Sequence, residues 1–454
     1  MGPCRRGRDG DRVWDNTGKH SPHESSEVPG MTYDRTGTPS GKDSAPGAGA
    51  PATAAGPAGG PSRRQVIGIV AAAVATVAVP ATAAATSATT RTAPTTASAA
   101  GVTARSRRLR ATGTLFIGTY TSSGGTGIGL ASYDTGTGGI TDTGTLQGVG
   151  DPSYLAVHPD GGTLYAVNER QDGGVTAIAL GENGDHTVLG TRGTGGSSPC
   201  HLSVHPGGRW LLSANYGSGN VAVHPIEASG ALGERTDLVT HTEPAPGPGQ
   251  NGPHAHQIVT SPDGAHVLAV DLGTDSVYTY RLDDTAGTLT RVSYARLPAG
   301  AGPRHLVFHP SGRFAYLANE LNNTIAVCPY DPGTGALTPG EPLPTGAGGA
   351  GDSFPSQPVI TGDGAFVFLA NRGHNSLSRF AVEDNGAGLR LLDTVPVGGD
   401  HPRQLALSPD GNLLFAANQR SNAVSVFHVD QDSGELAATG DPFASPVAVC
   451  VLPL

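Results

Sequence analysis

The stretch His309-Pro310-Ser311-Gly312, set between the apolar runs 306–308 and 314–318, decides the fold. It is one of six similar turns along the chain, and the other five are His158-Pro159-Asp160-Gly161, His205-Pro206-Gly207-Gly208, Ser261-Pro262-Asp263-Gly264, Thr361-Gly362-Asp363-Gly364 and Ser408-Pro409-Asp410-Gly411. Successive turns start 47, 56, 48, 52 and 47 residues apart. Ten residues after each start, an Asn or Asp ends an apolar run. The distance from each turn to its Asn or Asp is constant, whereas the distance between successive turns varies around fifty residues. This indicates a rigid hairpin repeated between loops of varied length, which is typical of a propeller.

Each repeat predicts four short strands. Around the turn at His309 these are 306–308, 314–318, 324–330 and a looser strand near Leu337. Pro, Asp and Gly reverse the chain between the first two strands. Four antiparallel strands in about fifty residues make one propeller blade. An open two-sheet sandwich with coincidental spacing is the alternative.

The seventh copy of the repeat is split between the two ends of the chain. Leu115–Tyr120 matches the second strand of a repeat, yet no first strand precedes it. The missing strand is Ser445–Val451, which matches Asp151–Val157. The C-terminal strand is therefore expected to pair with the N-terminal blade and close the ring without an open edge. The sequence predicts an all-β, seven-bladed propeller over residues 114–454, as one domain.

The first 113 residues differ from the repeats. Residues 1–61, rich in Gly, Pro, Ser and Thr, predict a disordered leader. Residues 62–85 carry Arg63-Arg64, an apolar run and small-residue cleavage sites, as in a twin-arginine signal peptide. Residues 86–113 predict a flexible linker. We therefore expect an extracellular protein, exported by the twin-arginine pathway, with no stable membrane insertion after cleavage. A single transmembrane anchor is the alternative, and the true start, Met1 or Met31, stays open.

Charge and residue usage exclude several functions. Residues 1–113 hold 14 of the 28 basic and 7 of the 38 acidic residues, which leaves the repeat region with a formal charge of −17. Such a surface repels nucleic acid and anionic membranes. Both lysines lie in the leader, so a lysine nucleophile is excluded. Three cysteines remain, and none has metal-ligand spacing. We expect no metal, no cofactor and a monomer.

Aligning the repeats reveals columns of polar residues at one end of the predicted channel. Five positions before each turn stand Ser153, Cys200, His256, Arg304, Ser356 and Arg403. The next column reads Tyr154, His201, Gln257, His305, Gln357 and Gln404. One position past each Asn or Asp stand Tyr120, Glu169, Tyr216, Leu272, Glu320, Arg372 and Gln419. The mouth of the first strand and the end of the second belong to one hairpin, so all three columns should rim the same end.

Three of the 14 arginines in the repeat region fall in these columns, namely Arg304, Arg372 and Arg403. Arginines that converge in an acidic protein indicate recognition of a carboxylate or phosphate by paired hydrogen bonds. Glutamates and histidines in the same columns add titratable groups. The alternative is that these polar residues bond the loop backbone, or that Arg and Glu simply pair. On paper, His254, His256 and Asp271 make a metal site, but their spacing matches no standard pattern.

These residues resemble the lactonase family of seven-bladed propellers, which includes a bacterial type of 6-phosphogluconolactonase and the fungal carboxymuconate-lactonising enzymes. The resemblance runs in order through residues 114–454. Its motifs are Phe116–Thr121, Gly252–Gln257, Gly302–His305, Asn319-Glu320, Asn371-Arg372 and His401–Arg403.

The resemblance implies a set of site residues. The muconate-lactonising branch suggests His256, Arg304, Glu320 and Arg372 as catalytic residues, with Arg403 as a competitor for the last position. Residues expected to bind substrate are His201, His305, Glu169, Gln257, Gln357 and Arg403. For a lactonase, water would attack the ester carbonyl while an arginine stabilises the oxyanion. Glu320 or His256 would take the proton, and the other would protonate the leaving alkoxide.

The function predicted from the sequence is a secreted lactonase, similar to 6-phosphogluconolactonase, acting on a small anionic or polyhydroxy lactone. Export makes an unphosphorylated sugar lactone or an aromatic-degradation lactone a better substrate than a cytoplasmic sugar phosphate. Two alternatives stay open: a muconate cycloisomerase that uses the same four residues, and a non-enzymatic secreted propeller that binds protein or glycan. In a pure scaffold the rim columns should be uniform, and here they differ.

Overall fold

The computed structural model describes residues 112–247, 250–349 and 351–454. The predicted leader and signal peptide, and all of the predicted linker except its last two residues, lie outside these ranges. Export therefore stays a prediction. The first strand begins at Thr112, two residues before the boundary that the repeat suggests. Within the described residues, no helix has the length and apolar character needed to cross a membrane.

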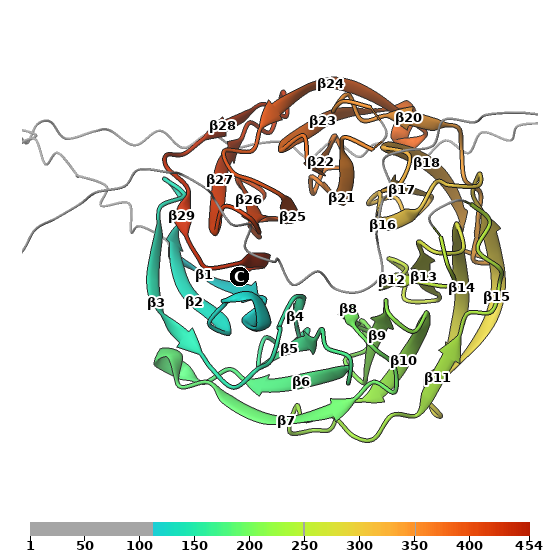
Figure 1. Ribbon diagram of the computed structural model, residues 1–454, viewed down its shortest axis with the longest axis horizontal. Coiled ribbons are helices and arrows are strands. Elements are labelled where there is room, and N and C mark those ends of the chain that lie inside the picture. Colours follow the sequence, from blue (N-terminus) through green and yellow to red (C-terminus); the bar gives the residue numbers. More distant parts are fainter. Residues whose placement is uncertain (1–111, 248–249, 350) are drawn as a thin grey trace, which may run out of the picture. The chain divides into compact units, whose positions relative to one another are not determined.

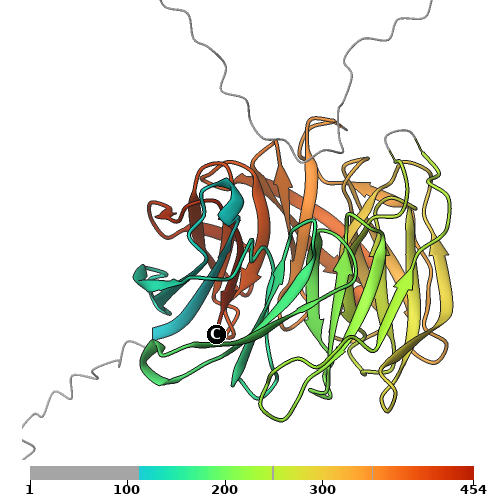
Figure 2. The ribbon, with the colours of Figure 1, turned by 60° about the horizontal axis from the view of Figure 1, so that its bottom comes forward.

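Seven antiparallel sheets stand around a central axis (Figure 1), which confirms the predicted seven-bladed, all-β propeller. The strands of each sheet run between the two faces of the ring (Figure 2). The innermost strands are β30 (Ala448–Pro453), β4 (Leu155–Val157), β8 (Pro199–Val204), β12 (Ala255–Thr260), β16 (Pro303–Phe308), β21 (Phe354–Ile360) and β25 (Pro402–Leu407). Next to them lie β1 (Thr112–Thr119), β5 (Thr163–Asn168), β9 (Trp210–Asn215), β13 (Val267–Asp271), β17 (Phe314–Asn319), β22 (Phe366–Arg372) and β26 (Leu413–Asn418).

Two further strands complete each blade toward the perimeter. The third strands are β2 (Ile128–Asp134), β6 (Gly174–Ala179), β10 (Asn220–Pro225), β14 (Ser276–Asp283), β18 (Thr324–Asp331), β23 (Ser376–Glu383) and β27 (Ala423–Val429). The outer strands are β3 (Ile140–Leu146), β7 (Thr187–Gly193), β11 (Asp237–Thr240), β15 (Thr288–Arg296), β19 (Ala336–Leu337) with β20 (Pro342–Pro344), β24 (Gly388–Pro396), and β28 (Leu436–Ala438) with β29 (Phe443–Ala444). Three short 3-10 helices are η1 (Thr121–Ser123), η2 (Glu182–Gly184) and η3 (Asp384–Gly386).

The six repeated turns join each first strand to the second, as predicted. In all six, the last residue is a glycine with a left-handed φ between 67° and 78°. Its N–H donates to the carbonyl of the first turn residue, as Gly312 does to His309 at 2.9 Å. A residue with a Cβ would be strained at this φ, so the glycine of the pattern is a backbone requirement.

The ring closes through the chain ends, as predicted. β30 pairs with β1, and the sheet order is β3-β2-β1-β30. The register differs from the sequence match, however. Thr119 pairs with Ala448, where the equivalent Asn215 and Asn319 pair with Pro199 and Pro303. Ala448, rather than Pro446, thus occupies the position of Pro152, and the predicted match was wrong by two residues.

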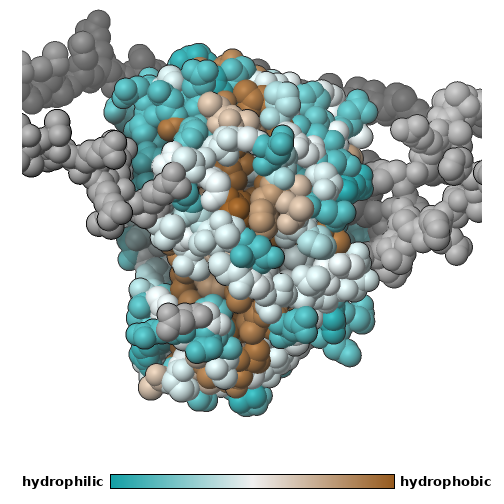
Figure 3. All heavy atoms as spheres, turned by 90° about the vertical axis from the view of Figure 1, so that its left-hand side faces the viewer, coloured by the Kyte–Doolittle hydropathy of each residue, from teal (hydrophilic) through white to brown (hydrophobic). Residues whose placement is uncertain are grey.

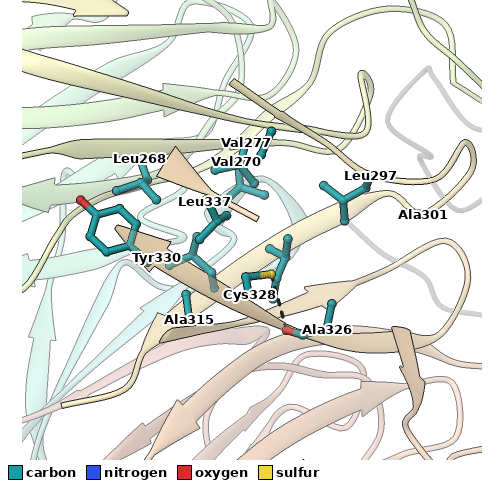
Figure 4. Close-up of a cluster of buried hydrophobic side chains, with 13 residues drawn as sticks. Leu268, Val270, Val277, Leu297, Ala301, Ala315, Ala326, Cys328, Tyr330 and Leu337 are labelled. Carbon is teal, nitrogen blue, oxygen red and sulfur yellow. Dashed lines mark hydrogen bonds between the residues drawn. The ribbon is translucent and has the colours of Figure 1, made fainter. Parts of the chain in front are cut away.

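A separate hydrophobic cluster fills each of the seven interfaces between neighbouring blades. Successive residues of a second strand point to opposite blades, so Leu164 and Ala166 pack toward the first blade while Tyr165 and Val167 pack toward the third. Figure 4 shows one cluster, where Leu268 and Val270 of β13 meet Cys328 and Tyr330 of β18. Because both faces of each sheet are covered, the inner strands read as continuous apolar runs.

Polar residues cover much of the outer side of the ring that Figure 3 displays, with narrower apolar areas between them. Cys200, Cys328 and Cys450 are buried free thiols. Cys328 and Cys450 lie in hydrophobic clusters between blades, where they act as small core residues.

Candidate active site

A repeated β-bulge aims polar side chains at the central axis. In β8, β12, β16, β25 and β30 the ladder skips one inner-strand residue just after the first pair. The skipped residues are Cys200, His256, Arg304, Arg403 and Val449; β21 skips Ser356 and Gln357 together. A bulge frees a residue from the ladder and changes its direction. Apart from Ser153, which precedes β4, the residues of the first polar column are therefore bulged residues.

The bulged residues surround a narrow cavity on the axis. Its lining comes from six blades, all but the one that contains β12, and consists of Ser153 and Tyr154 just before β4, and of Cys200, Arg304, His305, Gln357, Arg403, Gln404 and Val449 in inner strands. Two residues of the third column contact this lining: Glu320 pairs with Arg304, and Glu169 accepts from Ser153. The structure thus brings the predicted columns together at one end of the ring, and we call this region the funnel.

One cluster in the funnel joins two arginines to one glutamate. Arg304 Nε lies 3.0 Å, and Arg372 Nη2 2.6 Å, from the same oxygen, Oε2 of Glu320. Arg304 also donates to the Ser356 carbonyl at 2.8 Å, and Arg372 donates to the Phe354 carbonyl at 3.1 Å. Burial would raise the pKa of Glu320, but Arg372 and Arg304 hold it below its ordinary value. Glu320 is therefore ionised at neutral pH.

Arg304 is the most buried member of this cluster. Its side chain is only 2% exposed, so this arginine of the rim columns is buried rather than in contact with water. The bulge turns it into the cavity, where the neighbouring blades cover it. Burial and the nearby Arg372 lower the pKa of Arg304 to about 9, because it shares its one carboxylate partner. Its Nε–H has no well-aligned acceptor.

A second cluster spans the blades on either side of the seam. Glu169 Oε2 accepts hydrogen bonds from the Tyr120 hydroxyl at 2.8 Å and from Ser153 Oγ. Arg403 Nη2 lies 3.6 Å from the other oxygen, Oε1. The Arg403 guanidinium also stands 5.3 Å from the centre of the Tyr120 ring. The funnel thus holds three arginines and two glutamates.

His256 lies between the two clusters and is buried. Its Nδ1 is 3.7 Å from Cys200 Sγ, and its ring meets the Tyr216 and His305 rings edge-on. Burial, followed by Arg304, Arg403 and Arg372, lowers the pKa of His256 well below its ordinary value. The imidazole is therefore neutral at pH 7. Burial likewise raises the pKa of the Cys200 thiol, which argues against a thiolate nucleophile.

His201, His305 and Tyr154 form an aromatic group beside the cavity. The ring centres of His201 and His305 lie 5.3 Å apart, and those of Tyr154 and His201 lie 4.1 Å apart. Burial, with Arg304 second, lowers the pKa of His201 to about 3 and that of His305 well below its ordinary value. Neither ring nitrogen of His305 has a well-aligned partner.

The glutamines of the second column join neighbouring blades. Gln257 accepts from the Leu306 N–H at 2.7 Å and donates to its carbonyl at 3.1 Å. Gln357 donates to the Leu405 carbonyl, and Gln404 accepts from the Val451 N–H. For Gln257 and Gln404 these contacts favour the alternative in which the polar residues form structural hydrogen bonds with the backbone. Gln357 Oε1 lacks a partner and lies at the cavity.

The side chains of His254, His256 and Asp271, considered above as a metal site, do not point to a common position. Asp271 accepts from the backbone N–H groups of His254 and Thr274, and its other oxygen lies 2.5 Å from His241 Nδ1. The ring nitrogens of His254 contact the Tyr216 carbonyl and the Asn251 side chain. Among the described residues, no group of three or more His, Cys, Asp or Glu side chains is placed to hold a metal ion.

Several residues of the funnel were not among the predicted site residues, and two of them, Tyr120 and Ser153, contact Glu169. Tyr120 and Ser153 stood in the aligned columns but were not chosen, because a lone hydroxyl gives no charge signal. Their common contact, Glu169, comes from a different strand than either. Their positions in the aligned columns of two adjacent blades could have indicated that Tyr120, Ser153 and Glu169 lie close together.

The fold and the funnel define a seven-bladed propeller with an arginine-rich polar site on its axis. Residues 114–453 match the family described as "Lactonase, 7-bladed beta-propeller", and the chain belongs to this family. The 6-phosphogluconolactonase of Bacillus subtilis is 33% identical over 339 residues, which cover 74% of this chain and 97% of that protein.

Solved structures agree with this assignment. The periplasmic gluconolactonase of Pseudomonas aeruginosa is 31% identical, with a TM-score of 0.71, and covers 76% of this chain and 99% of its own. A protein from Lactobacillus plantarum is 34% identical, with a TM-score of 0.72, over 76% of this chain and 100% of its own. These relatives support a lactone hydrolase with a small lactone substrate.

Proposed function

We propose that the chain is an exported hydrolase of an unphosphorylated sugar-acid lactone, with the funnel as its active site. The observation that carries this proposal is Arg304, a buried guanidinium that shares its single carboxylate with Arg372. An oxyanion that develops beside Arg304 would supply the missing negative charge. This is the electrostatic stabilisation that acyl transfer to water needs.

The charge of the funnel favours an ester substrate. Arg304, Arg372 and Arg403 face Glu169 and Glu320, and the buried histidines are neutral, so one positive charge is left over. Water attack on a lactone carbonyl creates one negative charge. The same excess also suits a substrate that carries a single carboxylate, so muconolactone belongs in the tests.

The choice of an unphosphorylated lactone rests on two supports. The relative from Pseudomonas aeruginosa is called a periplasmic gluconolactonase, and Arg63-Arg64 with the following apolar run is typical of an export signal. Fractionation of cells that make the full chain checks export. A chain that stays in the cytoplasm would favour a sugar-phosphate lactone.

Replacing Arg304 with Met tests the proposal directly. We expect the rate of lactone opening, measured by pH-stat on sugar, sugar-phosphate and muconate lactones, to fall by about 10²–10³. Arg209→Met is the matched control, because Arg209 is exposed and pairs with Asp284 outside the funnel. Full activity in Arg304→Met would contradict the proposed role. No turnover of any lactone by the unchanged protein would favour a binding module.

A further inference from the structure

The two carboxylates of the funnel have different surroundings. Glu320 faces two guanidinium groups, both against Oε2. A proton placed on Glu320 would leave two buried cations without a counter-charge, which is costly in a dry site. Glu320 is therefore suited to remain a fixed negative charge during a reaction.

Glu169 is held by neutral groups instead. The hydroxyls of Tyr120 and Ser153 both donate to Oε2, which fixes the direction of the carboxylate. Oε1 lies 3.6 Å from Arg403 Nη2, beyond the length of a good charged hydrogen bond. The Glu169 side chain also keeps 16% of its surface exposed, so water reaches it.

The position of Glu169 places it next to the proposed reaction centre. Two of its three contacts, Ser153 and Arg403, line the cavity together with Arg304. His256 is the other candidate base, but burial and three arginines disfavour its charged form. A base that begins as an anion and ends neutral suits this positive site better than one that gains a positive charge.

We propose that Glu169 is the general base of the funnel, with Tyr120 and Ser153 as positioning residues. This inference rests on the proposed lactone hydrolysis. Glu169 Oε1 takes a proton from water as the water oxygen bonds to the lactone carbonyl carbon, and the carbonyl becomes an oxyanion beside Arg304. When the intermediate collapses, the ring C–O bond breaks. The proton on Glu169 then passes to the leaving alkoxide, which restores the carboxylate.

Glu169→Gln and Glu169→Ala test the base. Loss of general-base catalysis typically costs about 10²–10⁴ in rate, so we expect kcat at pH 7 to fall by that factor with little change in KM. Added formate should restore part of the rate of Glu169→Ala, because it can occupy the vacated space and accept the proton. Glu341→Gln, which removes an exposed charge outside the funnel, is the matched control.

Tyr120→Phe tests the positioning role separately. The ring stays against Arg403, but the hydrogen bond to Glu169 is lost. The carboxylate then loses a contact that fixes its direction, so kcat should fall with little change in KM. A purely structural tyrosine would lower stability without lowering kcat.

The outcomes separate the two proposals. If the unchanged protein opens no lactone, the proposed function fails. If it does open a lactone but Glu169→Gln keeps the full rate, or formate rescues Glu320→Ala and not Glu169→Ala, the assignment of the base is overturned while the function stands.

Discussion

At the scale of single residues, Glu320 stabilises the fold by neutralising charge on the two buried arginines that we propose take part in the reaction. It is the only carboxylate within ion-pair distance of Arg304 or Arg372 among the described residues. Removing one partner of a buried ion pair leaves an uncompensated charge. The glutamate is therefore a structural necessity of the funnel, whatever reaction occurs there.

We expect Glu320→Gln to lower the free energy of unfolding by about 3–5 kcal/mol, the usual cost of breaking a buried ion pair. Urea unfolding followed by circular dichroism measures this. Glu169→Gln should cost less, because Arg403 is 3.6 Å away and keeps its contact with the Tyr120 ring. Equal losses of unfolding free energy in Glu320→Gln and Glu169→Gln would contradict the structural role of Glu320.

The sequence pattern predicted which residues gather in the funnel but not how deeply their side chains are buried. The spacing placed Arg304 and Glu320 in columns at one end of the ring, and both lie there. The burial of Arg304 depends on a bulge in β16, which no residue type announces. The contact between Tyr120 and Glu169 depends on how the first blade packs against the second. Side-chain direction and contacts between blades come from packing, which spacing alone does not encode.

At the scale of elements, the seam strand β30 completes two interfaces at once. Ala448 and Val451 pack into the cluster between the last and first blades, and Cys450 packs into the next cluster. β30 also supplies every inner-strand hydrogen bond of β1. Its loss would expose an edge strand and open two hydrophobic clusters.

We therefore expect deletion of residues 445–454 to give insoluble or non-cooperatively unfolding protein. A synthetic peptide of residues 445–454, added during refolding, should restore solubility because it can pair with β1. The point variant Val451→Asp, which buries a charge without removing the strand, should lower the urea midpoint of the full chain. A soluble truncation with a single sharp unfolding transition would speak against the seam.

The fold could be predicted from the sequence because its turns have a recognisable residue pattern that ends in glycine. All six predicted turn glycines have the left-handed φ that the pattern requires. The register of the seam was misjudged because Pro446 suggested a match with Pro152, whereas it is Val447 that has the left-handed φ (47°) found at the equivalent residues Asp151, Ser198 and His401. A β-branched residue usually avoids this conformation, so nothing about the residue type of Val447 marked the position.

At the scale of the whole molecule, buried neutral histidines link folding to pH. Burial, with Arg304 second, lowers the pKa of His201 to about 3. Burial, which outweighs the Gly193 carbonyl contact, lowers the pKa of His224 to about 4. The folded state thus favours the uncharged rings. This stability is fully present above the ordinary histidine pKa and is lost as the pH falls below it.

We expect stability to decline from about pH 6.5, the ordinary pKa of histidine, downward. Each such histidine should cost about 2 kcal/mol at pH 5, from 1.4 kcal/mol per pH unit. Urea midpoints at pH 7.5, 6 and 5 measure this, and His224→Gln should show a smaller decline. Carboxylates such as Glu320, whose pKa Arg372 and Arg304 lower against the effect of burial, contribute only at more acidic pH. A flat profile down to pH 5 would refute the linkage.

The repeated bulge separates scaffold from chemistry. The residue before the skipped position or positions is Pro or Ala in all six bulged strands, whereas the skipped residues are cysteine, histidine, arginine, valine and, in β21, serine followed by glutamine. Because these positions take no part in the ladder, exchanging them leaves the strand pairing intact. A ring built this way can acquire a new substrate by a single codon change at a bulge, without first evolving a new architecture.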